Sequence, residues 1–491
     1  NQDFNNNTLP LIESFGYDLQ GAETGAFIDT QVLFSPRVGF NWDVNGDMRT
    51  QVRGGAGIFT SRIPLVWQGG AFNNYGLNIG GGRNDNEPFN PDVQDQWPGD
   101  IDPNNVTPSG QVDLFAADFK LPQVFKLNLA VDQKLPWGMI GTLEGIYSKH
   151  INYLRYQNLN LKPSEFNLTA GPDDRPVFNQ FDEIDAKYTG IFLASNTDKG
   201  GYSYNLIASL TKPFDNGFSA SLSYSYGDSY TLFDGTSSQN NSQWRGYFNE
   251  DGRNADGDPM RSTFAAGHRV LATLSYRKEY LNHLASEFSI IFNGQSGQPF
   301  TYVVGAFNDN FVNDGGFDFN ELMFVPESAG QINLVETTVD GQVYSPSEQW
   351  AILDSYISDR NGLADFRGDY VDRNTDRTPF EAIVDLRFLQ DVFINMGNGK
   401  RNTLQFSVDI FNFTNMLNKD WGRRRNFGFG TYDLISLENQ IDADNTTPEY
   451  SVNDEVLRGE DPWEDDINDF GFRSARWQMQ LGIRYIFGNA R

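Results

Sequence analysis

The stretch Ala475-Arg-Trp-Gln-Met-Gln-Leu-Gly-Ile-Arg-Tyr-Ile-Phe487 alternates between apolar and polar side chains. From the tryptophan onward its odd-numbered positions are apolar or aromatic, and Ile486 is the one break among the even-numbered positions. Strict period-two alternation places the two sets on opposite faces of a β-strand. Aromatic residues lie at both ends of the apolar face. This pattern is typical of a strand in a transmembrane barrel, with Tyr485 and Phe487 in an interfacial girdle.

The same alternation recurs along the chain in pairs of segments joined by short turns. In the third pair a row of serines lies opposite a row of large apolar residues, as expected for water on one face and lipid on the other. The paired segments are 38–42 with 52–58, 125–131 with 141–147, 202–210 with 218–226, 270–276 with 288–292, and 384–388 with 404–410. The turns between them are 43–47, 135–138, 215–217, 281–283 and 397–399. With the last strand, the pattern predicts about eleven strands.

Long polar segments separate these pairs, at 60–120, 228–265, 300–379 and 415–474. Short turns on one side and long loops on the other distinguish an outer-membrane barrel from a soluble sandwich. The sequence therefore predicts an all-β, antiparallel transmembrane barrel with long extracellular loops. We expect residues 1–33 to be an extracellular loop region, the strand from 141 to continue to about Leu161, and residues 191–195 to extend a hairpin above the membrane.

The composition excludes several other classes of protein. The chain has 491 residues, no cysteine and a net charge of −28, and its apolar content is rich in phenylalanine and tyrosine. It contains no run of apolar residues long enough for a transmembrane helix. The lack of cysteine excludes disulfides and thiolate metal sites. The acidic balance disfavours nucleic acid as a partner, because phosphate binding needs basic patches.

An odd number of strands cannot close as a bacterial single-chain barrel. An open sheet edge in lipid would leave backbone groups unpaired, at several kcal/mol each. We therefore expect more strands before residue 1, and we interpret residues 34–491 as the C-terminal half of a larger barrel. The chain begins without a signal peptide, so it is predicted to be a mature piece or a fragment.

Several stretches resemble TonB-dependent outer-membrane transporters, in particular an Oar-like group related to SusC-like receptors. They are residues 34–47, 52–59, 158–161 and 481–487. The spacing of Gln480, Gly482, Tyr485 and Phe487 is similar to the terminal signal read by the barrel-assembly machinery. Four residues follow Phe487, whereas the family usually ends on the aromatic residue.

The resemblance implies a 22-stranded barrel filled by an N-terminal plug. It also implies import of a nutrient, namely a glycan, a peptide or a metal chelate, and no enzymatic activity. The expected partners are outer-membrane lipids and lipopolysaccharide, TonB through the plug that this chain lacks, and a surface lipoprotein, in the outer membrane of a diderm bacterium. The alternatives are a passive porin-like channel and a barrel for surface adhesion or secretion.

Aromatic and arginine side chains in the long segments are the candidates for substrate binding, because such surfaces bind sugars, peptides and other polar ligands. They are Trp67, Phe72, Tyr75, Trp421, Arg423 and Arg424. The alternative is that these segments simply pack on one another. Lys126, Asp132, Glu144, Asp385 and Arg387 fall on the polar faces of strands, and are expected to line the lumen or contact the plug.

Oxygen-bearing residues at short spacing suggest a calcium site formed by Asp251, Asn254, Asp256 and Asp258, and the alternative is a solvated loop. The superficially similar segment 43–47 is better interpreted as a hairpin turn. His150, His268 and His283 are scattered, which argues against a histidine metal site or a catalytic triad. His268 opens a strand on the apolar face and is predicted to lie at the membrane interface.

Overall fold

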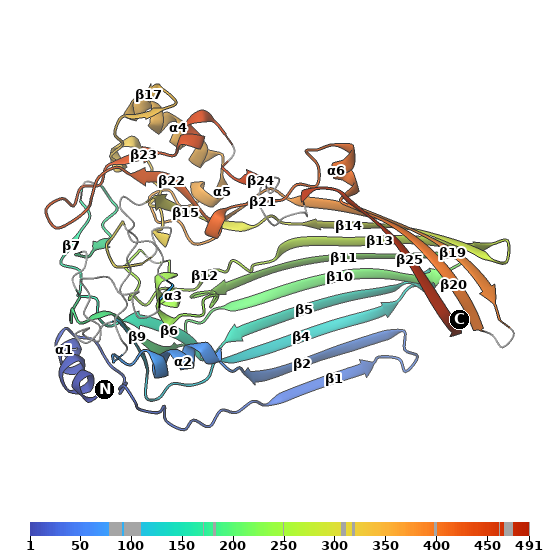
Figure 1. Cartoon of the computed structure of the whole chain (residues 1–491), viewed down its shortest axis with the longest axis horizontal. Coiled ribbons are helices and arrows are strands. Elements are labelled where there is room, and N and C mark those ends of the chain that lie inside the picture. Colours follow the sequence, from blue (N-terminus) through green and yellow to red (C-terminus); the bar gives the residue numbers. More distant parts are fainter. Residues whose placement is uncertain are drawn as a thin grey trace.

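The computed structural model of the chain describes residues 1–77, 91–92, 110–169, 171–179, 183–248, 250–305, 311–316, 320–396, 400–460, 462–465 and 475–490. These residues form a large curved sheet and, at one end of it, a domain built from the long connections (Figure 1). No helix among them is long and apolar enough to cross a membrane.

The sheet contains eleven antiparallel strands in the order β1-β2-β4-β5-β10-β11-β13-β14-β19-β20-β25, and a short β12 (Met260–Arg261) pairs with β11. The strands are β1 (Arg37–Asp43), β2 (Thr50–Thr60), β4 (Gln123–Lys134), β5 (Ile140–His150), β10 (Tyr202–Asp215), β11 (Phe218–Thr231), β13 (Gly267–Tyr280), β14 (Leu284–Gln295), β19 (Glu381–Asn395), β20 (Lys400–Phe411) and β25 (Gln478–Ala490). Each predicted hairpin is present. The all-β, antiparallel fold is therefore confirmed.

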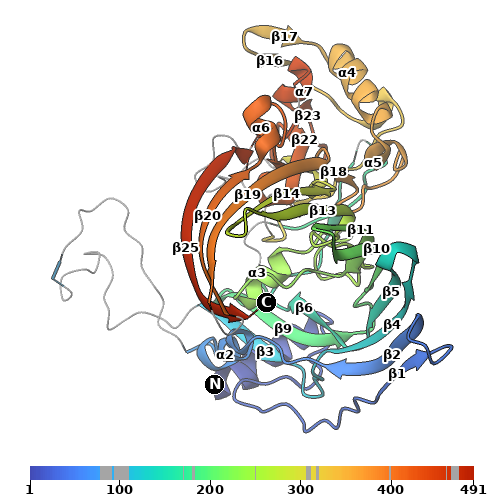
Figure 2. The ribbon, with the colours of Figure 1, turned by 90° about the vertical axis from the view of Figure 1, so that its right-hand side faces the viewer.

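Viewed along the strands, the sheet is an arc that runs from β1 to β25 (Figure 2). Each of these two strands has one neighbour within the described residues. The hairpin turns that the structure describes lie together at one end, whereas the long connections gather at the other end (Figure 1). The sheet thus has the predicted one-sided distribution of turns and loops.

The strand register keeps apolar side chains on one face of the sheet. Tyr204 lies opposite Tyr147 on one neighbour, and Leu210 lies opposite Leu222 on the other. On the last strand Leu481 and Ile483 are 69% and 73% exposed. A face that continues across eleven strands without a protein layer on it needs an apolar surrounding.

The turns follow the predicted chemistry where the structure describes them. Asn216 and Gly217 both have positive φ, 53° and 82°, as tight hairpins require. A Cβ on Gly217 would lie 2.1 Å from the carbonyl oxygen of Arg277, so only glycine fits there. The carboxylate of Asp43 accepts bonds from the N–H groups of Gly46 and Met48, which confirms the turn at 43–47. The predicted turn at 397–399 lies outside the described residues.

Aromatic side chains border the apolar face at both ends. At the loop end, Tyr202 stacks on Tyr230 with 5.0 Å between ring centroids, and the rings of Tyr226 and His268 are 4.6 Å apart. His268 is exposed at the start of β13, where an interfacial histidine was predicted. At the turn end, the Tyr485 and Phe487 rings are in edge contact at 4.3 Å. Two such borders are the girdles of a membrane-spanning sheet.

Two predicted boundaries are wrong. β25 runs from Gln478 to Ala490 rather than from 475 to 487, because the residues after Phe487 still pair with β20 across a register shift near Arg401. β5 ends at His150 and does not continue to Leu161. The next strand, β6 (Tyr153–Asn158), leaves the wall because it pairs with β9 (Tyr188–Thr197). Residues 191–195 lie in β9 and pair antiparallel with β6, as the expected extended hairpin requires, and their position above the membrane stays a prediction.

The long connections fold into what we call the loop domain, as the alternative of segments that pack on one another allows. Its helices are η1 (Phe4–Thr8), α1 (Leu9–Ser14), α2 (Leu65–Asn73), α3 (Asn240–Arg245), η5 (Ala329–Gln331), α4 (Pro346–Ser358), α5 (Asn361–Ala364), α6 (Phe413–Leu417), η6 (Gly428–Gly430) and α7 (Asp454–Arg458); η3 (Pro136–Gly138) is in a hairpin turn. Its other strands are β3 (Gly110–Phe115), β7 (Phe166–Asn167), β8 (Pro176–Val177), β15 (Pro299–Gly305), β16 (Thr337–Val339), β17 (Gln342–Tyr344), β18 (Asp376–Arg377), β21 (Arg425–Asn426), β22 (Thr431–Leu437), β23 (Tyr450–Val452) and β24 (Glu464–Asp465).

Candidate functional site

The loop domain has two apolar cores. The first, here the α2 core, gathers side chains from the N-terminal helices, α2, β3, β6, β9 and α3. Trp67 packs in it with its ring edge-on to Tyr156, at 6.2 Å, and donates from Nε1 to the carbonyl of Ser237 at 2.8 Å. Trp244 of α3 is also fully buried there. A core of this kind fixes the loops relative to one another.

The second core, here the α4 core, gathers β15, β22, β23, α4 and α5. β15 and β22 run parallel, which joins the connection after β14 to the connection after β20. Helix α4 begins with a capping box between Ser345 and Glu348, which satisfies two backbone donors at its first turn. Leu353 and Ile357 on this helix are completely buried. Two connections far apart in sequence are thus packed as one body.

Buried ion pairs hold the loop domain together. Arg253 contacts both Asp314 and Glu321, with 2.7 Å to the latter, and its side chain is 2% exposed. Arg175 donates to Asp173 at 2.9 Å and lies 3.9 Å from Glu321. Burial raises the pKa of Glu321, and the charge of Arg253 opposes that rise. Removing one charge from such a buried set leaves the other uncompensated, which costs several kcal/mol.

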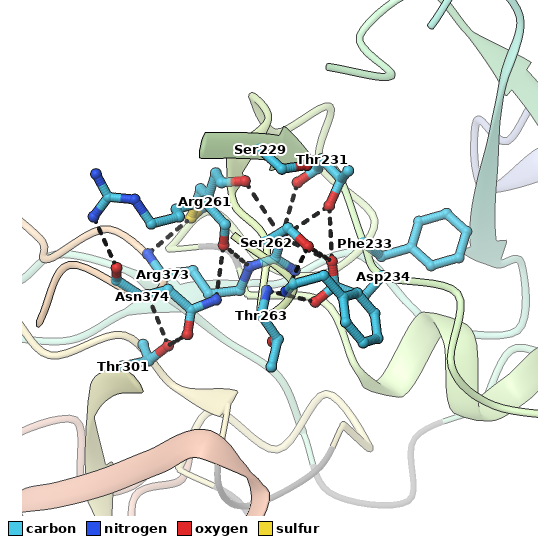
Figure 3. Close-up of polar contacts among 12 residues, drawn as sticks. Ser229, Thr231, Phe233, Asp234, Arg261, Ser262, Thr263, Thr301, Arg373 and Asn374 are labelled. Atoms are coloured by element: carbon cyan, nitrogen blue, oxygen red, sulfur yellow. Dashed lines mark hydrogen bonds and ion pairs between the residues drawn. The ribbon is translucent and has the colours of Figure 1, made fainter. Parts of the chain in front are cut away.

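Arg373 is the centre of a second polar network, which Figure 3 shows. Its guanidinium donates to the carbonyl oxygens of Arg261 and Thr231 at 2.9 and 3.1 Å, and lies 3.8 Å from the carboxylate of Asp234. Asp234 in turn accepts from the Ser262 hydroxyl at 2.6 Å and from the N–H of Thr263 at 3.0 Å. Arg373 therefore joins the connection after β11 to the connection after β14.

Asn374 extends the same network toward β15 (Figure 3). Its side chain donates to the carbonyl of Arg261 at 2.8 Å, and its carbonyl accepts from the Arg261 guanidinium at 3.0 Å. Its N–H donates to the hydroxyl of Thr301 at 3.0 Å. Asn374 is 1% exposed and has φ of 59°, a conformation that asparagine tolerates better than most residues. The Arg373 network thus reaches β15, one of the strands of the α4 core.

A cavity of about 240 Å³ opens beside the α2 core. Aromatic rings of Phe27, Phe72, Phe115 and Phe119 line it, and the buried Asp113 carboxylate lies at its wall. Phe27 and Phe72 are 84% and 67% exposed. Asp113 accepts from the side chains of Asn74 and Gln111, and burial raises its pKa. An aromatic pocket with a few polar groups, here Glu23, Gln68 and Asp113, suits a ring or an apolar side chain of a ligand.

The structure separates the predicted substrate residues. Trp67 is 6% exposed and packs in the α2 core. For this residue the alternative is therefore correct, and its role is to pack the long connections against one another. Phe72 lines the cavity, whereas Tyr75 is half-buried and bridges to Val112. Trp421 is 53% exposed near α6, and Figures 1 and 2 both show α6 far from α2. The two groups therefore do not form one site.

The two remaining candidates, Arg423 and Arg424, make ion pairs. Arg423 is paired with Asp420 at 2.6 Å, and Arg424 lies 3.5 Å from Glu381. Substrate binding by Trp421 and these arginines stays a prediction.

The predicted calcium ligands are partly engaged with protein groups. The Asn254 side-chain oxygen accepts from the N–H of Asn158 at 2.8 Å and from Trp244 Nε1 at 2.9 Å. Asp258 pairs with Lys199 at 3.1 Å, and Asp256 lies 3.8 Å from the same ammonium. Within the described part of the chain, no group of three or more His, Asp or Glu side chains could hold a metal ion. Calcium binding stays a prediction, with Asp251 exposed to solvent.

The polar face of the sheet carries the charged residues predicted to face inward. Arg53 bridges Asp132 at 2.9 Å and Glu144 at 3.1 Å, across three strands. Near the other edge, a polar cavity of about 410 Å³ is lined by Asp385, Arg387, Gln405, Asp409, Gln480 and Arg484, among others. Arg387 lies 3.3 Å from Asp409 there. The Lys126 ammonium is 5.8 Å from the Phe59 ring centroid.

Sequence reasoning missed the arginine networks and the aromatic cavity. Arg373 and the Thr231 carbonyl that it bonds are 142 positions apart, and Arg253 is 61 positions from Asp314. No local pattern encodes such a pairing. The available signal was the density of aromatic residues in the long connections, which indicated a packed core as much as a ligand surface.

Comparison with known proteins identifies the family of this chain. The family described as "Outer membrane beta barrel domain" matches residues 3–431. The chain therefore belongs to this family, and it is an integral protein of the outer membrane. The apolar face of the sheet is accordingly its lipid-facing side, and the loop domain lies at the end of the long connections. None of the curated protein sequences matches this chain.

Two solved structures of outer-membrane proteins are similar to parts of this chain. The ferric enterobactin receptor PfeA of Pseudomonas aeruginosa has a TM-score of 0.35 and 11% identity, over 81% of this chain and 36% of that one. The outer membrane transporter YddB of Escherichia coli has a TM-score of 0.37 and 11% identity, over 79% of this chain and 37% of that one. The chain thus spans little more than a third of the length of these proteins.

Proposed function

We propose that this chain is part of an importer that takes a nutrient across the outer membrane through a plugged barrel and is energised by TonB. The observation that carries the proposal is the packed loop domain at one end of a barrel wall whose inner face is polar. A passive channel needs an open mouth, whereas a receptor needs a rigid surface that holds a ligand over the lumen. The two cores and the Arg373 network make the loops rigid.

The finer features follow from the resemblance stated above. They are an Oar-like or SusC-like subtype, a 22-stranded barrel of which this chain supplies half, an N-terminal plug that contacts TonB, and an associated surface lipoprotein. The substrate class is a glycan, a peptide or a metal chelate. Phe72 and the cavity beside it are the proposed contact for an apolar part of the ligand. The proposal assigns no catalytic chemistry to the chain.

Planar-bilayer conductance of the full-length protein tests this proposal without knowledge of the substrate. A plugged importer is expected to give no steady ohmic conductance, whereas a passive channel conducts at once. Uptake by cells then separates the importer from an adhesion or secretion barrel. Accumulation of a labelled oligosaccharide, oligopeptide or ferric chelate that depends on this gene should stop when a protonophore dissipates the inner-membrane gradient. Steady conductance, or uptake that the protonophore does not change, would overturn the proposal.

A further inference from the structure

The cavity beside the α2 core, which we call the Phe72 cavity, combines an aromatic interior with an exposed border. Phe115 and Phe119 belong to its wall, and Phe119 is buried. Phe27 and Phe72 also belong to its lining but are strongly exposed, so their rings border the opening rather than fill the interior. A cavity of this shape encloses one apolar group of a ligand and leaves the rest of the ligand in water.

The charged side chains in the lining of the Phe72 cavity are both acidic. They are Glu23 and Asp113, whereas Arg62 and Lys120 flank two of the lining segments along the chain without belonging to the lining. The Glu23 carboxylate is exposed, and it makes no ion pair with any residue that the structure describes. A negative charge of this kind, beside an open aromatic cavity, favours a cation on the ligand.

The second acid, Asp113, has a different role from Glu23. Its carboxylate accepts from the side chains of Asn74 and Gln111, at 2.9 and 2.5 Å, and it is 3% exposed. A Cβ on Gly70 would lie 2.5 Å from this carboxylate, so the backbone of α2 approaches it closely. Protein donors therefore occupy Asp113, which fixes the wall of the cavity, and Glu23 is the acid that remains for a ligand.

The lining of the Phe72 cavity is poor in side-chain hydrogen-bond donors. The Thr24 hydroxyl already donates to the side-chain oxygen of Asn5 at 2.8 Å. Among the described residues of the lining, Gln68 carries the one side-chain amide. The hydroxyls of a sugar need donors as well as acceptors, and the negatively charged oxygens of a chelate need donors or cations. This lining therefore suits an apolar side chain better than either.

We propose that the Phe72 cavity binds a positively charged oligopeptide, with one aromatic side chain of the peptide inside the cavity and a lysine ammonium beside Glu23. The phenylalanine rings at the opening favour the same ligand, because the face of an aromatic ring attracts a cation. Glu23 repels an anionic metal chelate, which adds selectivity against that class. This inference rests on the proposed function, since it names the substrate class of the importer.

Isothermal titration calorimetry on the full-length protein in detergent tests the proposal with capped pentapeptides as probes. The lysine peptide has a central phenylalanine and a lysine at each end. In the alanine peptide, alanine replaces the phenylalanine, and in the glutamate peptide, glutamate replaces both lysines. A maltooligosaccharide and an anionic ferric tricatecholate represent the other two substrate classes. We expect the lysine peptide to bind about tenfold more tightly than any other probe, as for a buried aromatic anchor.

Substitutions in the lining separate the two parts of the site. Phe72→Ala should weaken binding of the lysine peptide about tenfold. The matched control is Leu65→Ala, because Leu65 is an exposed residue of the same helix and does not line the cavity. Glu23→Lys should weaken binding of the lysine peptide and strengthen that of the glutamate peptide, each by a few-fold, as for an exposed ion pair. Glu13→Lys, at an exposed position of α1, should change neither.

Three results would overturn the peptide assignment. They are no binding of the lysine peptide, equal or tighter binding of any other probe, and unchanged affinity in both Phe72→Ala and Glu23→Lys. Heat-modifiable migration on gels reports folding of each variant, and Phe27→Ala replaces Phe72→Ala if the latter does not fold. Binding in detergent needs neither TonB nor an ion gradient. Its failure therefore leaves the conductance and uptake tests of the importer unaffected, and failure of those tests leaves peptide binding intact.

Discussion

The barrel wall and the loop domain use apolar residues in opposite ways. In the wall, Leu481 and Ile483 are 69% and 73% exposed on the lipid-facing side. In the loop domain, Leu353 and Ile357 are completely buried. The wall satisfies its backbone by strand pairing and leaves its apolar side chains to the membrane, whereas the domain must bury a core in water. Substitutions of similar chemistry should therefore have different consequences in the two regions.

The largest effect is expected from Arg373→Met. The variant would leave Asp234 buried without its cation and several carbonyl oxygens without a donor, which should cost about 3–5 kcal/mol of loop-domain stability. Hydrogen exchange of residues 228–265 in the full-length protein measures this, and should show fast exchange while the wall stays protected. Lys199→Met is the control, because Lys199 pairs with the exposed Asp258. Equal protection in both variants would mean that the network does not hold the domain.

Trp67→Ala should cost nearly as much, about 3–5 kcal/mol, because it empties a ring-sized space in the α2 core. Phe72→Ala, five positions along the same helix, should stay within about 0.5 kcal/mol, since the side chain is 67% exposed. Thermal unfolding of the loop domain compares the two variants. It is monitored by near-ultraviolet signals that do not depend on tryptophan, or by proteolysis. A destabilising Phe72→Ala would show that this ring is structural and weaken its proposed role in ligand contact.

A charge on the lipid-facing side should destabilise the wall. Ile483→Arg is expected to cost about 2–4 kcal/mol if the residue lies near the bilayer midplane. Gln480→Arg places the same side chain on the polar face of the same strand and should be tolerated. Urea unfolding in lipid vesicles measures both. If the two variants were equally stable, the assignment of the two faces would be wrong.

The smallest effect concerns pH. Burial raises the pKa of Asp113, so the folded state holds this proton more tightly than the unfolded chain does. Its contribution to stability is therefore fully present below the ordinary aspartate pKa of about 4, and is lost as pH rises through the raised value. Asp113→Asn should flatten that part of the stability–pH curve of the loop domain. A curve parallel to the wild type would show that Asp113 does not titrate differently on folding.

The wall could be predicted from the sequence because its pattern is local. Residues two apart share a face, so alternation at 202–210 and 218–226 predicts the hairpin, its faces and its turn at Gly217 without knowledge of any partner. The wrong predictions concern segments where alternation does not specify which strand is the partner or where the pairing ends. The segment after His150 still alternates, but Leu154 and Tyr156 face the α2 core, so β6 joins another sheet. At the end of β25, pairing with β20 continues past the last aromatic residue.

The candidate sites were less predictable. Trp67 and Phe72 look alike in sequence, two aromatic residues in one polar stretch, yet one is buried and the other lines a cavity. The difference depends on which face of α2 meets β6 and α3. Those elements lie between 80 and 180 positions further along the chain, which is beyond the reach of periodicity.

Sequence alternation alone predicts the eleven strands, their two faces, and the short turns opposite the long connections. The reason is that every second side chain of a strand in lipid faces the membrane and must be apolar, so each strand carries the pattern in its own sequence. The roles of individual charges depend on long-range packing. Arg373 and Arg377 lie four residues apart, but the Arg373 guanidinium is buried against Asp234, whereas the Arg377 guanidinium donates to the carbonyl oxygens of Gly297 and Ala265. Their partners come from distant connections, and long-range packing alone brings those together.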